Sequence, residues 1–325
     1  MLARLLAAYR RTGADLPFGD PARAHGVGME GYYWRLTDLA ARRVVVAICG
    51  VARADDGLWA MVILAAHPGD FVRVGTTRSA LADPARFGVR AETALVADAR
   101  RLRVDLGADA QLDVALRERV PWPRRAFGAL GPAQAVPGLH QYWHPVGLGG
   151  RAYGHARLGG GEVRLDGAAA YAEKNWGAAF SAHWWWGQAF PEPEVCIAFA
   201  GGRIGLGPLT VAPSAVVVRA GSELVSLRPP AARMAAAVRD GAWRVRGRGA
   251  RHSVLIEGDA DPAAAAALPV PLPARRAFEP RSRQVLAGRL AVTVRRGRRV
   301  LYRGESGLAG LEHGGEPEPR PGVHG

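Results

Sequence analysis

Lysine and asparagine are almost absent from this chain of 325 residues: each occurs once, and the two are neighbours, Lys174 and Asn175. Every other basic residue is arginine. An ammonium group is compact and shifts its pKa readily when buried, which a guanidinium group does not. We therefore expect Lys174 to serve a role that arginine cannot fill.

Cysteine and long apolar runs are also scarce. The two cysteines, Cys49 and Cys196, lie inside apolar segments, which suits small buried side chains in a reducing compartment better than a disulfide. No run approaches the roughly 20 apolar residues that span a bilayer. Arginines interrupt the apolar residues of segment 1–11, which predicts a short amphipathic turn or helix rather than a secretory signal. We predict a cytoplasmic protein, with any membrane contact being peripheral.

Several catalytic motifs are missing. There is no Gly-x-Ser-x-Gly elbow, no P-loop and no Cys-x-x-Cys, and the glycine-rich segment 201–207 has no helix after it, so it is not a dinucleotide fingerprint. His140 and His144 are four residues apart, but without a helix signal or an intervening Glu they do not form a zinc-protease motif. Hydrolase, kinase and dehydrogenase activities lose support, and we expect no metal.

The formal net charge of +14 raises the question of nucleic acid. The arginines, however, are scattered through alternating segments, and no zinc-finger, RNP-like or helix-turn-helix pattern accompanies them. The charge favours an arginine-rich solvated surface over a nucleic-acid site. Contact with anionic lipid headgroups is the alternative that it leaves open.

Alternation of polar and apolar residues dominates the chain and predicts an all-β fold. Segments 101–106, 111–116, 243–246 and 290–294 alternate as half-buried strands do, whereas 43–48 and 59–64 are continuously apolar, as expected of strands covered on both faces. Turn signals occupy 54–57, 67–70, 159–161, 201–202 and 296–297. The helical candidates are 229–239 and a short turn at 262–267.

The strand rhythm breaks over the loop-rich stretch 121–150 and again before Ala168. We therefore place a domain boundary near residues 160–170. The predicted units are an N-terminal β-barrel-like domain over 20–165 and a C-terminal one over 166–313. The tail 314–325, which is rich in Pro, Glu and Gly, is predicted to be disordered.

Two aromatic segments precede this boundary. As a strand, 29–38 places Glu30, Tyr32, Trp34 and Leu36 on one face and Gly31, Tyr33 and Arg35 on the other. Such a face lines a barrel interior with rings and one carboxyl group, or else packs a core in which Glu30 pairs with an arginine such as Arg35. Segment 137–145 is expected to be a loop that holds Tyr142, Trp143 and His144 over a cavity mouth, or that only packs against the body.

The third aromatic segment follows the lone lysine. Seven rings fall within 171–190, and Glu173, Lys174 and Asn175 bring an acid, an amine and an amide among them. Low dielectric in such an enclosure shifts the pKa of either ionisable group and favours their pairing. A protonated carboxyl group can then donate to a double bond, while indole faces stabilise the resulting cation. The alternative is a buried Glu-Lys ion pair that only fixes two strands. A fourth segment, 304–315, is a glycine-rich closing stretch to which we assign no chemistry.

These segments, taken in order, resemble the tocopherol cyclase family over about residues 25–315. The matching blocks are Glu30-Gly-Tyr-Tyr-Trp-Arg35, Gln141-Tyr-Trp-His-Pro145, Glu173-Lys-Asn-Trp-Gly177, Trp184-Trp-Trp-Gly-Gln188 and Ala309-Gly-Leu-Glu-His-Gly-Gly315. The block at 173–177 is the most specific of them. The chain departs from the family at Ser181, where proline is usual, and at 189–190, where an asparagine is expected.

The resemblance implies a calycin-like, lipocalin-like all-β fold, related to that of carotenoid 1,2-hydratases, with two consecutive antiparallel barrel or sandwich domains and few short helices. It also implies a cofactor-independent intramolecular lyase or isomerase that closes a chromanol ring on a prenylated quinol. The partner would be that hydrophobic prenylated molecule, whose nature makes peripheral membrane contact reasonable. Two alternatives remain: hydration of an isoprenoid double bond, and lipocalin-like binding of an isoprenoid without turnover.

Cyclisation requires an acid for the alkene, a wall for the tertiary cation and a group that presents the phenolic oxygen. We choose Glu173 as the proton donor, with Asp38 as the second choice. Lys174 is expected to position or tune Glu173, and Asn175 to orient the donor or the quinol. The expected substrate-binding residues are Glu30, Tyr33, Trp34, Tyr142, Trp143, His144, Tyr171, Trp176, Trp184, Trp186 and Gln188. Alternation separates Trp184 and Trp186 from Trp185, so we expect only the first pair to face the pocket.

Overall fold

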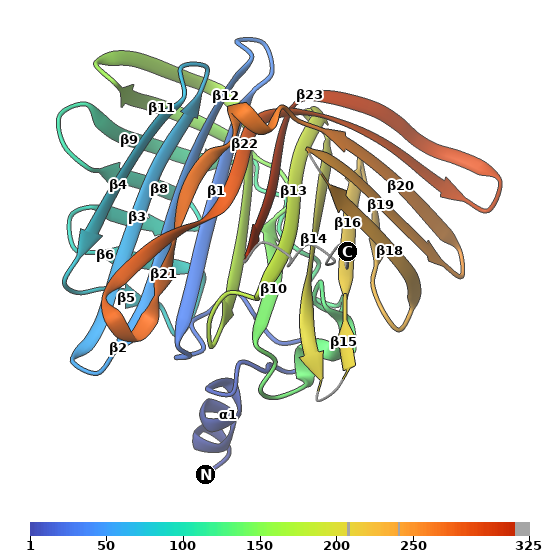
Figure 1. Ribbon diagram of the computed structural model, residues 1–325, viewed down its shortest axis with the longest axis horizontal. Coiled ribbons are helices and arrows are strands. Elements are labelled where there is room, and N and C mark those ends of the chain that lie inside the picture. The colour runs from blue at the N-terminus through green and yellow to red at the C-terminus, as the bar shows by residue number, and fades with distance from the viewer. Residues whose placement is uncertain (207–208, 240, 316–325) are drawn as a thin grey trace, which may run out of the picture.

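Two antiparallel β-sheets account for almost all regular structure in the computed structural model, which describes residues 1–206, 209–239 and 241–315 (Figure 1). The first sheet contains β1 (Met29–Asp38), β2 (Arg43–Ala54), β3 (Gly57–His67), β4 (Phe71–Thr77), β5 (Leu81–Ala82), β6 (Gly88–Ala91), β7 (Leu95–Asp98), β8 (Arg101–Asp105), β9 (Ala110–Arg117), β10 (Gln141–Gly147), β11 (Arg151–Leu158) and β12 (Gly161–Gly177). Its strand order is β4-β3-β2-β1-β12-β11-β9-β8-β7-β6-β5, and β10 pairs separately with β12.

The second sheet follows in the chain. It contains β13 (His183–Glu192), β14 (Val195–Leu206), β15 (Leu209–Val211), β16 (Ser214–Ala220), β17 (Glu223–Leu227), β18 (Ala232–Arg239), β19 (Ala242–Gly249), β20 (His252–Asp259), β21 (Ala266–Leu272), β22 (Ala277–Arg296) and β23 (Arg299–Gly315). Its order is β17-β16-β14-β13-β23-β22-β20-β19-β18, with β15 on β14 and β21 on β22.

Each sheet curls around an apolar core of its own, so the all-β, barrel-like prediction is confirmed. In the first barrel, Val45 and Val62 share a core with Val89 and Leu102 from strands far along the sheet. In the second, Val216 and Val225 meet Val245 and Val292 in the same way. A third apolar cluster lies between the barrels, and the site described below is built beside it.

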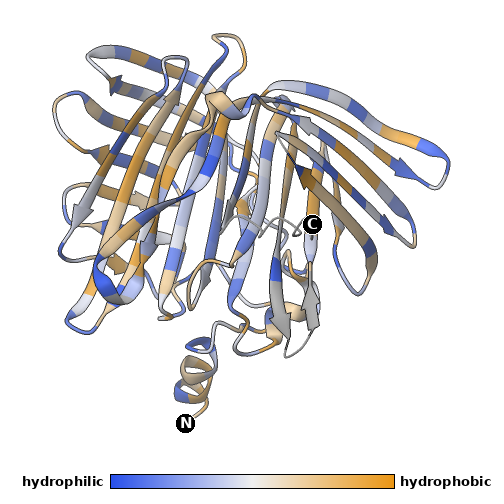
Figure 2. Cartoon of the chain, viewed as in Figure 1, coloured by the Kyte–Doolittle hydropathy of each residue, from blue (hydrophilic) through white to orange (hydrophobic). Residues whose placement is uncertain are grey.

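The alternation of the sequence follows from these three cores. In β9 and β19, buried residues alternate with more exposed ones, as predicted. Strands β2 and β3 are buried along most of their length because Val45 and Ala47 face the first core while Val44 and Val46 face the cluster between the barrels. Figure 2 shows the contrast between these strands and the outer strands of the second sheet, which change colour from residue to residue.

Helices are few, as expected. The turn or helix predicted at the N-terminus is the helix α1 (Leu2–Arg10). Of the short helical turn predicted over 262–267, Pro262–Ala264 form the 3₁₀ helix η2, which the Asp261 carboxylate caps. Two further 3₁₀ helices are η1 (Gly131–Ala135) and η3 (Pro273–Arg275). Among the described residues, no helix is long and apolar enough to cross a membrane.

The helix predicted over 229–239 is wrong. Residues Ala232–Arg239 form β18, which pairs with β19 and buries every second side chain at least partly, from Ala232 to Val238. Alanine has a high helix propensity, but that preference is weak, and pairing at the edge of the second sheet overrides it. Alanine and valine at alternate positions suit this half-buried strand.

The turn predicted at 201–202 is also wrong, because both glycines lie inside β14. A Cβ on Gly201 would stand 2.5 Å from the indole of Trp185, and one on Gly202 would stand 2.9 Å from the carbonyl oxygen of His183. These glycines let the neighbouring strand approach closely, which is a second reason for glycine in a strand. The other four predicted turns connect consecutive strands.

Two further predictions concern irregular segments. Residues 137–140 precede β10, but Gln141–Pro145 belong to that strand, so the predicted loop over a cavity is wrong for its second half. The link between the two sheets runs from Gly177, where β12 of the first sheet ends, to His183, where β13 of the second sheet begins. Of the tail predicted to be disordered, Gly314 and Gly315 end β23, and residues 316–325 lie outside the described part of the chain.

Candidate active site

A cavity of about 290 Å³ lies between the two barrels. The first sheet contributes residues from β1, β2, β3, β10 and β12, and the second contributes them from β13, β14, β16, β21, β22 and β23. The lining residues that bear on chemistry are Tyr33, Trp143, Glu173, Asn175, Trp184, Trp185, Trp186, Ser282 and Glu312. The pocket is therefore an inter-barrel site rather than the interior of one barrel.

Glycines on facing strands leave room for this cavity. Gly31 and Gly50 line it from the first barrel, and Gly201 and Gly202 line it from the second. A Cβ on Gly31 would stand 2.6 Å from the side-chain oxygen of Asn175, its partner across the β1–β12 ladder. A larger residue at position 31 would thus displace the amide of Asn175.

Glu173 is held on β12 by three donors that meet on one carboxylate oxygen. Tyr171 Oη donates to Oε2 at 2.6 Å, Trp143 Nε1 at 2.8 Å and Trp186 Nε1 at 2.9 Å. Glu173 is only 3% exposed, and burial raises its pKa to about 7 although the three hydrogen bonds oppose the shift. A carboxyl group in this state is protonated in a substantial fraction of molecules near neutral pH.

Glu312 on β23 is a second acid in the same cavity, and sequence reasoning missed it. Trp184 Nε1 donates to its Oε1 at 2.7 Å, and Gln284 Nε2 donates to its Oε2 at 3.0 Å. Desolvation by burial raises the pKa of Glu312, and its negative charge in turn contributes to the raised pKa of Glu173. A signal did exist: Glu312 is the only acid in 306–315, a stretch without arginine in an arginine-rich chain.

Aromatic rings close the cavity around these acids. The rings of Tyr33 and Trp186 meet edge to face with centroids 4.9 Å apart, and Phe180 packs on Trp184 at 5.1 Å. Trp184 and Trp186 direct their indole nitrogens at the two acids, as their shared face on β13 predicted. Trp185 borders the cavity too, but it belongs to the core of the second barrel.

Lys174 does not pair with Glu173, so that prediction is wrong. The two residues are consecutive in a strand and face opposite sides of it. Lys174 Nζ lies 2.7 Å from Glu30 Oε2 and 3.1 Å from His25 Nδ1, and it donates to the carbonyl oxygen of Arg23. Lys174 is fully buried, which lowers its pKa, while the charge of Glu30 opposes that shift. The lone lysine thus binds the N-terminal segment to the first barrel.

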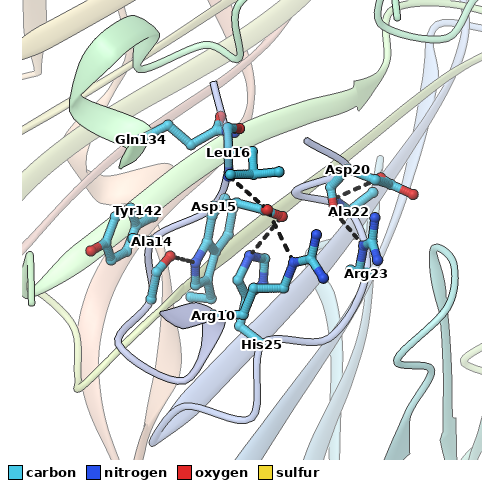
Figure 3. Close-up of polar contacts among 12 residues, drawn as sticks. Arg10, Ala14, Asp15, Leu16, Asp20, Ala22, Arg23, His25, Gln134 and Tyr142 are labelled. Atoms are coloured by element: carbon cyan, nitrogen blue, oxygen red, sulfur yellow. Dashed lines mark hydrogen bonds and ion pairs between the residues drawn. The ribbon is translucent and has the colours of Figure 1, made fainter. Parts of the chain in front are cut away.

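A second buried ion cluster extends from that lysine into the N-terminal segment. Figure 3 shows Arg10 and His25 converging on the carboxylate of Asp15. The distances are 3.0 Å from Arg10 Nε to Oδ1 and 3.5 Å from His25 Nε2 to Oδ2. His25 also stacks on Trp176, with centroids 4.6 Å apart. These contacts of Asp15 hold the segment before β1 in place, and neither of them involves the cavity acids.

Arg35 does not pair with Glu30 but makes a different contact. It lies on the opposite face of β1 from Glu30, is fully buried, and donates to the carbonyl oxygens of Leu286 and Leu308 in the second sheet. Both carbonyls sit where the β22–β23 register shifts, and such a shift leaves backbone groups unpaired by the ladder. Arg35 consequently ties one barrel to the other.

The remaining predicted site residues fall into two groups. Tyr142 lines the cavity, while Tyr171 contacts it only through Glu173. The others lie outside the cavity lining: Trp34 in the core of the first barrel, Trp176 stacked on His25 and Tyr142, Glu30 on Lys174, His144 beside Trp122, Gln188 near Cys196, and Asp38 at the end of β1. Asp38 accepts from the backbone of Ala41, 2.9 Å away.

Within the described ranges, no group of three or more His, Cys, Asp or Glu side chains is arranged to hold a metal ion. Cys49 and Cys196 are both buried and free. The polar groups that line the cavity include the two acids, the Tyr33 hydroxyl, the hydroxyl groups of Ser214 and Ser282, and the amide of Asn175. Asn175 Oδ1 has no hydrogen-bond partner among the described residues.

Comparison with solved structures shows which proteins share this fold. Kievitone hydratase from Nectria haematococca superposes with a TM-score of 0.53 and 10% identity over 90% of either chain. The protein CghA, solved with Sch210972, gives a TM-score of 0.58 and 10% identity over 88% of either chain. At this identity the likeness shows a shared two-barrel, calycin-like fold.

Comparison with known sequences supplies the family. "Tocopherol cyclase, chloroplastic" from Zea mays is 28% identical over 140 residues, 41% of this chain and 30% of that protein. "Probable tocopherol cyclase, chloroplastic" from Oryza sativa subsp. japonica is 29% identical over 130 residues, 38% of this chain and 28% of that protein. Each match thus spans less than a third of the plant protein. The family model described as tocopherol cyclase-like matches residues 137–315, which include both cavity acids, and the chain therefore belongs to the tocopherol cyclase-like family.

Proposed function

We propose that this protein closes a chromanol ring on a prenylated quinol by protonating the prenyl double bond. The observation that carries the proposal is Glu173: an acid with a pKa of about 7, enclosed by indole and phenol groups in an inter-barrel cavity. Such an acid retains its proton near neutral pH and can give it to a weak base. An alkene is a base of that kind.

Two indole rings lie next to the acid, where they can also stabilise a cation. Trp143 and Trp186 each donate a hydrogen bond to Glu173, so their rings lie beside the position where the proton leaves. Protonation of a trisubstituted alkene forms a tertiary cation, which aromatic faces stabilise by about 0.5–2 kcal/mol each. The cavity folds the prenyl chain so that the phenolic oxygen reaches the cation, which lowers the entropic part of the barrier.

The state of Glu173 makes the pH dependence of the reaction predictable. The donor is active when protonated, and it is protonated below its pKa of about 7. We expect kcat to fall as pH rises through about 7 and to drop roughly tenfold per unit well above it. Measuring kcat at saturating substrate between pH 5 and pH 9 checks this, and a rate that stays constant up to pH 9 would argue against a carboxyl donor.

Hydration is a second candidate, and Asn175 favours it. Its Oδ1 lines the cavity without a partner among the described residues, and it lies on the same face of β12 as Glu173. A buried, unpaired carbonyl oxygen is a place where a water molecule is retained. A water held there would compete with the quinol oxygen for the same cation.

Incubation of the purified protein with a phytyl or geranylgeranyl benzoquinol separates these functions. Product with the mass of the substrate, but with a closed ring by chromatography against a chromanol standard, supports cyclisation. A gain of one water identifies hydration. Substrate recovered unchanged from a stable complex identifies a carrier and contradicts the proposed enzyme.

A further inference from the structure

The second cavity acid, Glu312, has no part in the proton donation assigned to Glu173. It comes from the last strand of the second barrel, opposite Trp186 of β13 and Gln284 of β22 in the sheet register. Glu173 comes from β12, which pairs with β1, β10 and β11 in the first barrel. Each barrel thus brings one carboxyl group to the same cavity.

Hydrogen bonding differs between the two acids. All three donors to Glu173 address Oε2, and among the described residues no donor reaches Oε1, which leaves that oxygen to carry a proton. On Glu312 each oxygen accepts an N–H group, Oε1 from Trp184 and Oε2 from Gln284. Donors to both oxygens favour an ionised carboxylate, because a protonated oxygen would turn its own hydrogen toward one of them.

From this asymmetry we propose that Glu312 is the catalytic base of the site, accepting the phenolic proton while Glu173 serves as the acid. This inference rests on the proposed cyclisation and assigns its second proton. One proton shared by two neighbouring carboxyl groups is the usual state of such a pair.

The proton balance of the step is as follows. The O–H bond of Glu173 breaks as a C–H bond forms at the less substituted alkene carbon, which leaves a tertiary cation. The phenolic oxygen forms the C–O bond with that cation, and its O–H bond breaks as the proton passes to Glu312. Substrate and product are isomers, and the enzyme then holds its proton on Glu312 instead of Glu173.

Tyr33 is placed to return that proton. Its hydroxyl oxygen accepts from the same Gln284 Nε2 that holds Glu312, at 3.4 Å. Tyr33 lines the same cavity as both acids. Burial is the main cause that raises the pKa of Tyr33, and the negative charges of Glu173 and Glu312 add to it. A phenol that stays protonated can pass a proton from one carboxyl group to the other by accepting one and releasing one.

A reaction run in deuterium oxide distinguishes the residue that protonates the alkene from the residue that accepts the phenolic proton. If Glu173 protonates the alkene but no base takes the phenolic proton, the cation returns a proton to Glu173, and deuterium from the solvent enters the recovered substrate. For Glu312→Gln we therefore expect chromanol formation to fall about 100-fold or more, while deuterium exchange into recovered quinol stays within about tenfold of the wild type. Glu173→Gln should lose both signals.

Two control variants accompany Glu312→Gln: one changes another carboxylate of the same strand, and the other keeps a carboxylate at position 312. Glu305→Gln removes an exposed carboxylate of β23 that pairs with Arg289, and it should leave both signals unchanged. Glu312→Asp keeps the carboxylate and should recover part of the cyclisation that Glu312→Gln loses, which guards against a variant that misfolds.

The outcomes that overturn the inference are distinct from failure of the proposed function. Cyclisation at the wild-type rate by Glu312→Gln contradicts a base role. Loss of exchange together with cyclisation in Glu312→Gln and in Glu312→Asp also contradicts it, because the residue would then support folding or the first proton transfer. A wild-type protein that forms no chromanol overturns the proposed cyclisation itself, and this inference with it.

Discussion

Replacing Glu173 with glutamine is expected to lower turnover of a prenylated quinol by about 10²–10⁴-fold, the usual contribution of a positioned general acid. An amide has nearly the shape of a carboxyl group but no acidic proton. Its oxygen can still accept from Tyr171, Trp143 and Trp186, which now meet on Oε2 of the glutamate. Quinol binding should therefore change little, and the loss should fall on kcat rather than KM.

Steady-state kinetics and a direct binding titration test this expectation together. Glu162→Gln is the matched control, because Glu162 is exposed on the same strand β12 and takes no part in the cavity. Glu173→Gln with wild-type kcat would remove Glu173 from the donor role. A loss of quinol binding as large as the loss of turnover would instead make it a binding residue.

Replacing Lys174 with methionine is expected to lower the free energy of unfolding by about 3–5 kcal/mol, the cost of removing one partner from a buried ion pair. The variant leaves the carboxylate of Glu30 buried without its cation. It also removes the donor to the carbonyl oxygen of Arg23 and the contact with His25. Chemical denaturation followed by tryptophan fluorescence measures the change.

A second substitution shows whether the unpaired charge of Glu30 causes this loss of stability. Glu30→Gln combined with Lys174→Met should regain part of the stability, because no unpaired charge remains in the double variant. Lys174→Arg should also be destabilised, since a guanidinium group is larger than the ammonium group that now lies fully buried near the rings of Tyr32 and Trp176. Wild-type stability of Lys174→Met would mean that the lone lysine has no structural role.

Much of the fold could be predicted because local pattern and burial agree. Strands β8, β9 and β19 alternate in sequence as they alternate in burial, and β2 and β3 are apolar along most of their length because each separates two cores. Where one residue type serves two purposes, the pattern failed. Alanine suits both a helix and the edge strand β18, and glycine suits both a turn and the close approach of Trp185 to Gly201.

The site was harder to predict, because its parts come together only through tertiary structure. The block 173–177 was recognisable from its residue types, and Glu173 lines the cavity between the barrels. Its neighbour Lys174 was assigned to the wrong partner because adjacency in sequence means opposite faces in a strand. Glu312 stands 139 positions further along the chain, and only the docking of two barrels brings it to the cavity that Glu173 lines.

The division of the cavity between barrels has a consequence for the order of synthesis. When the ribosome has completed β12, the first barrel still presents Tyr33, Val46, Met61 and Trp143 on the face that the second barrel later covers. That face stays apolar and open until β13 to β23 have followed. Exposed apolar surfaces of this kind are prone to aggregate and are bound by chaperones. Slow production of the second half should therefore lower the yield of soluble protein more than slow production of the first.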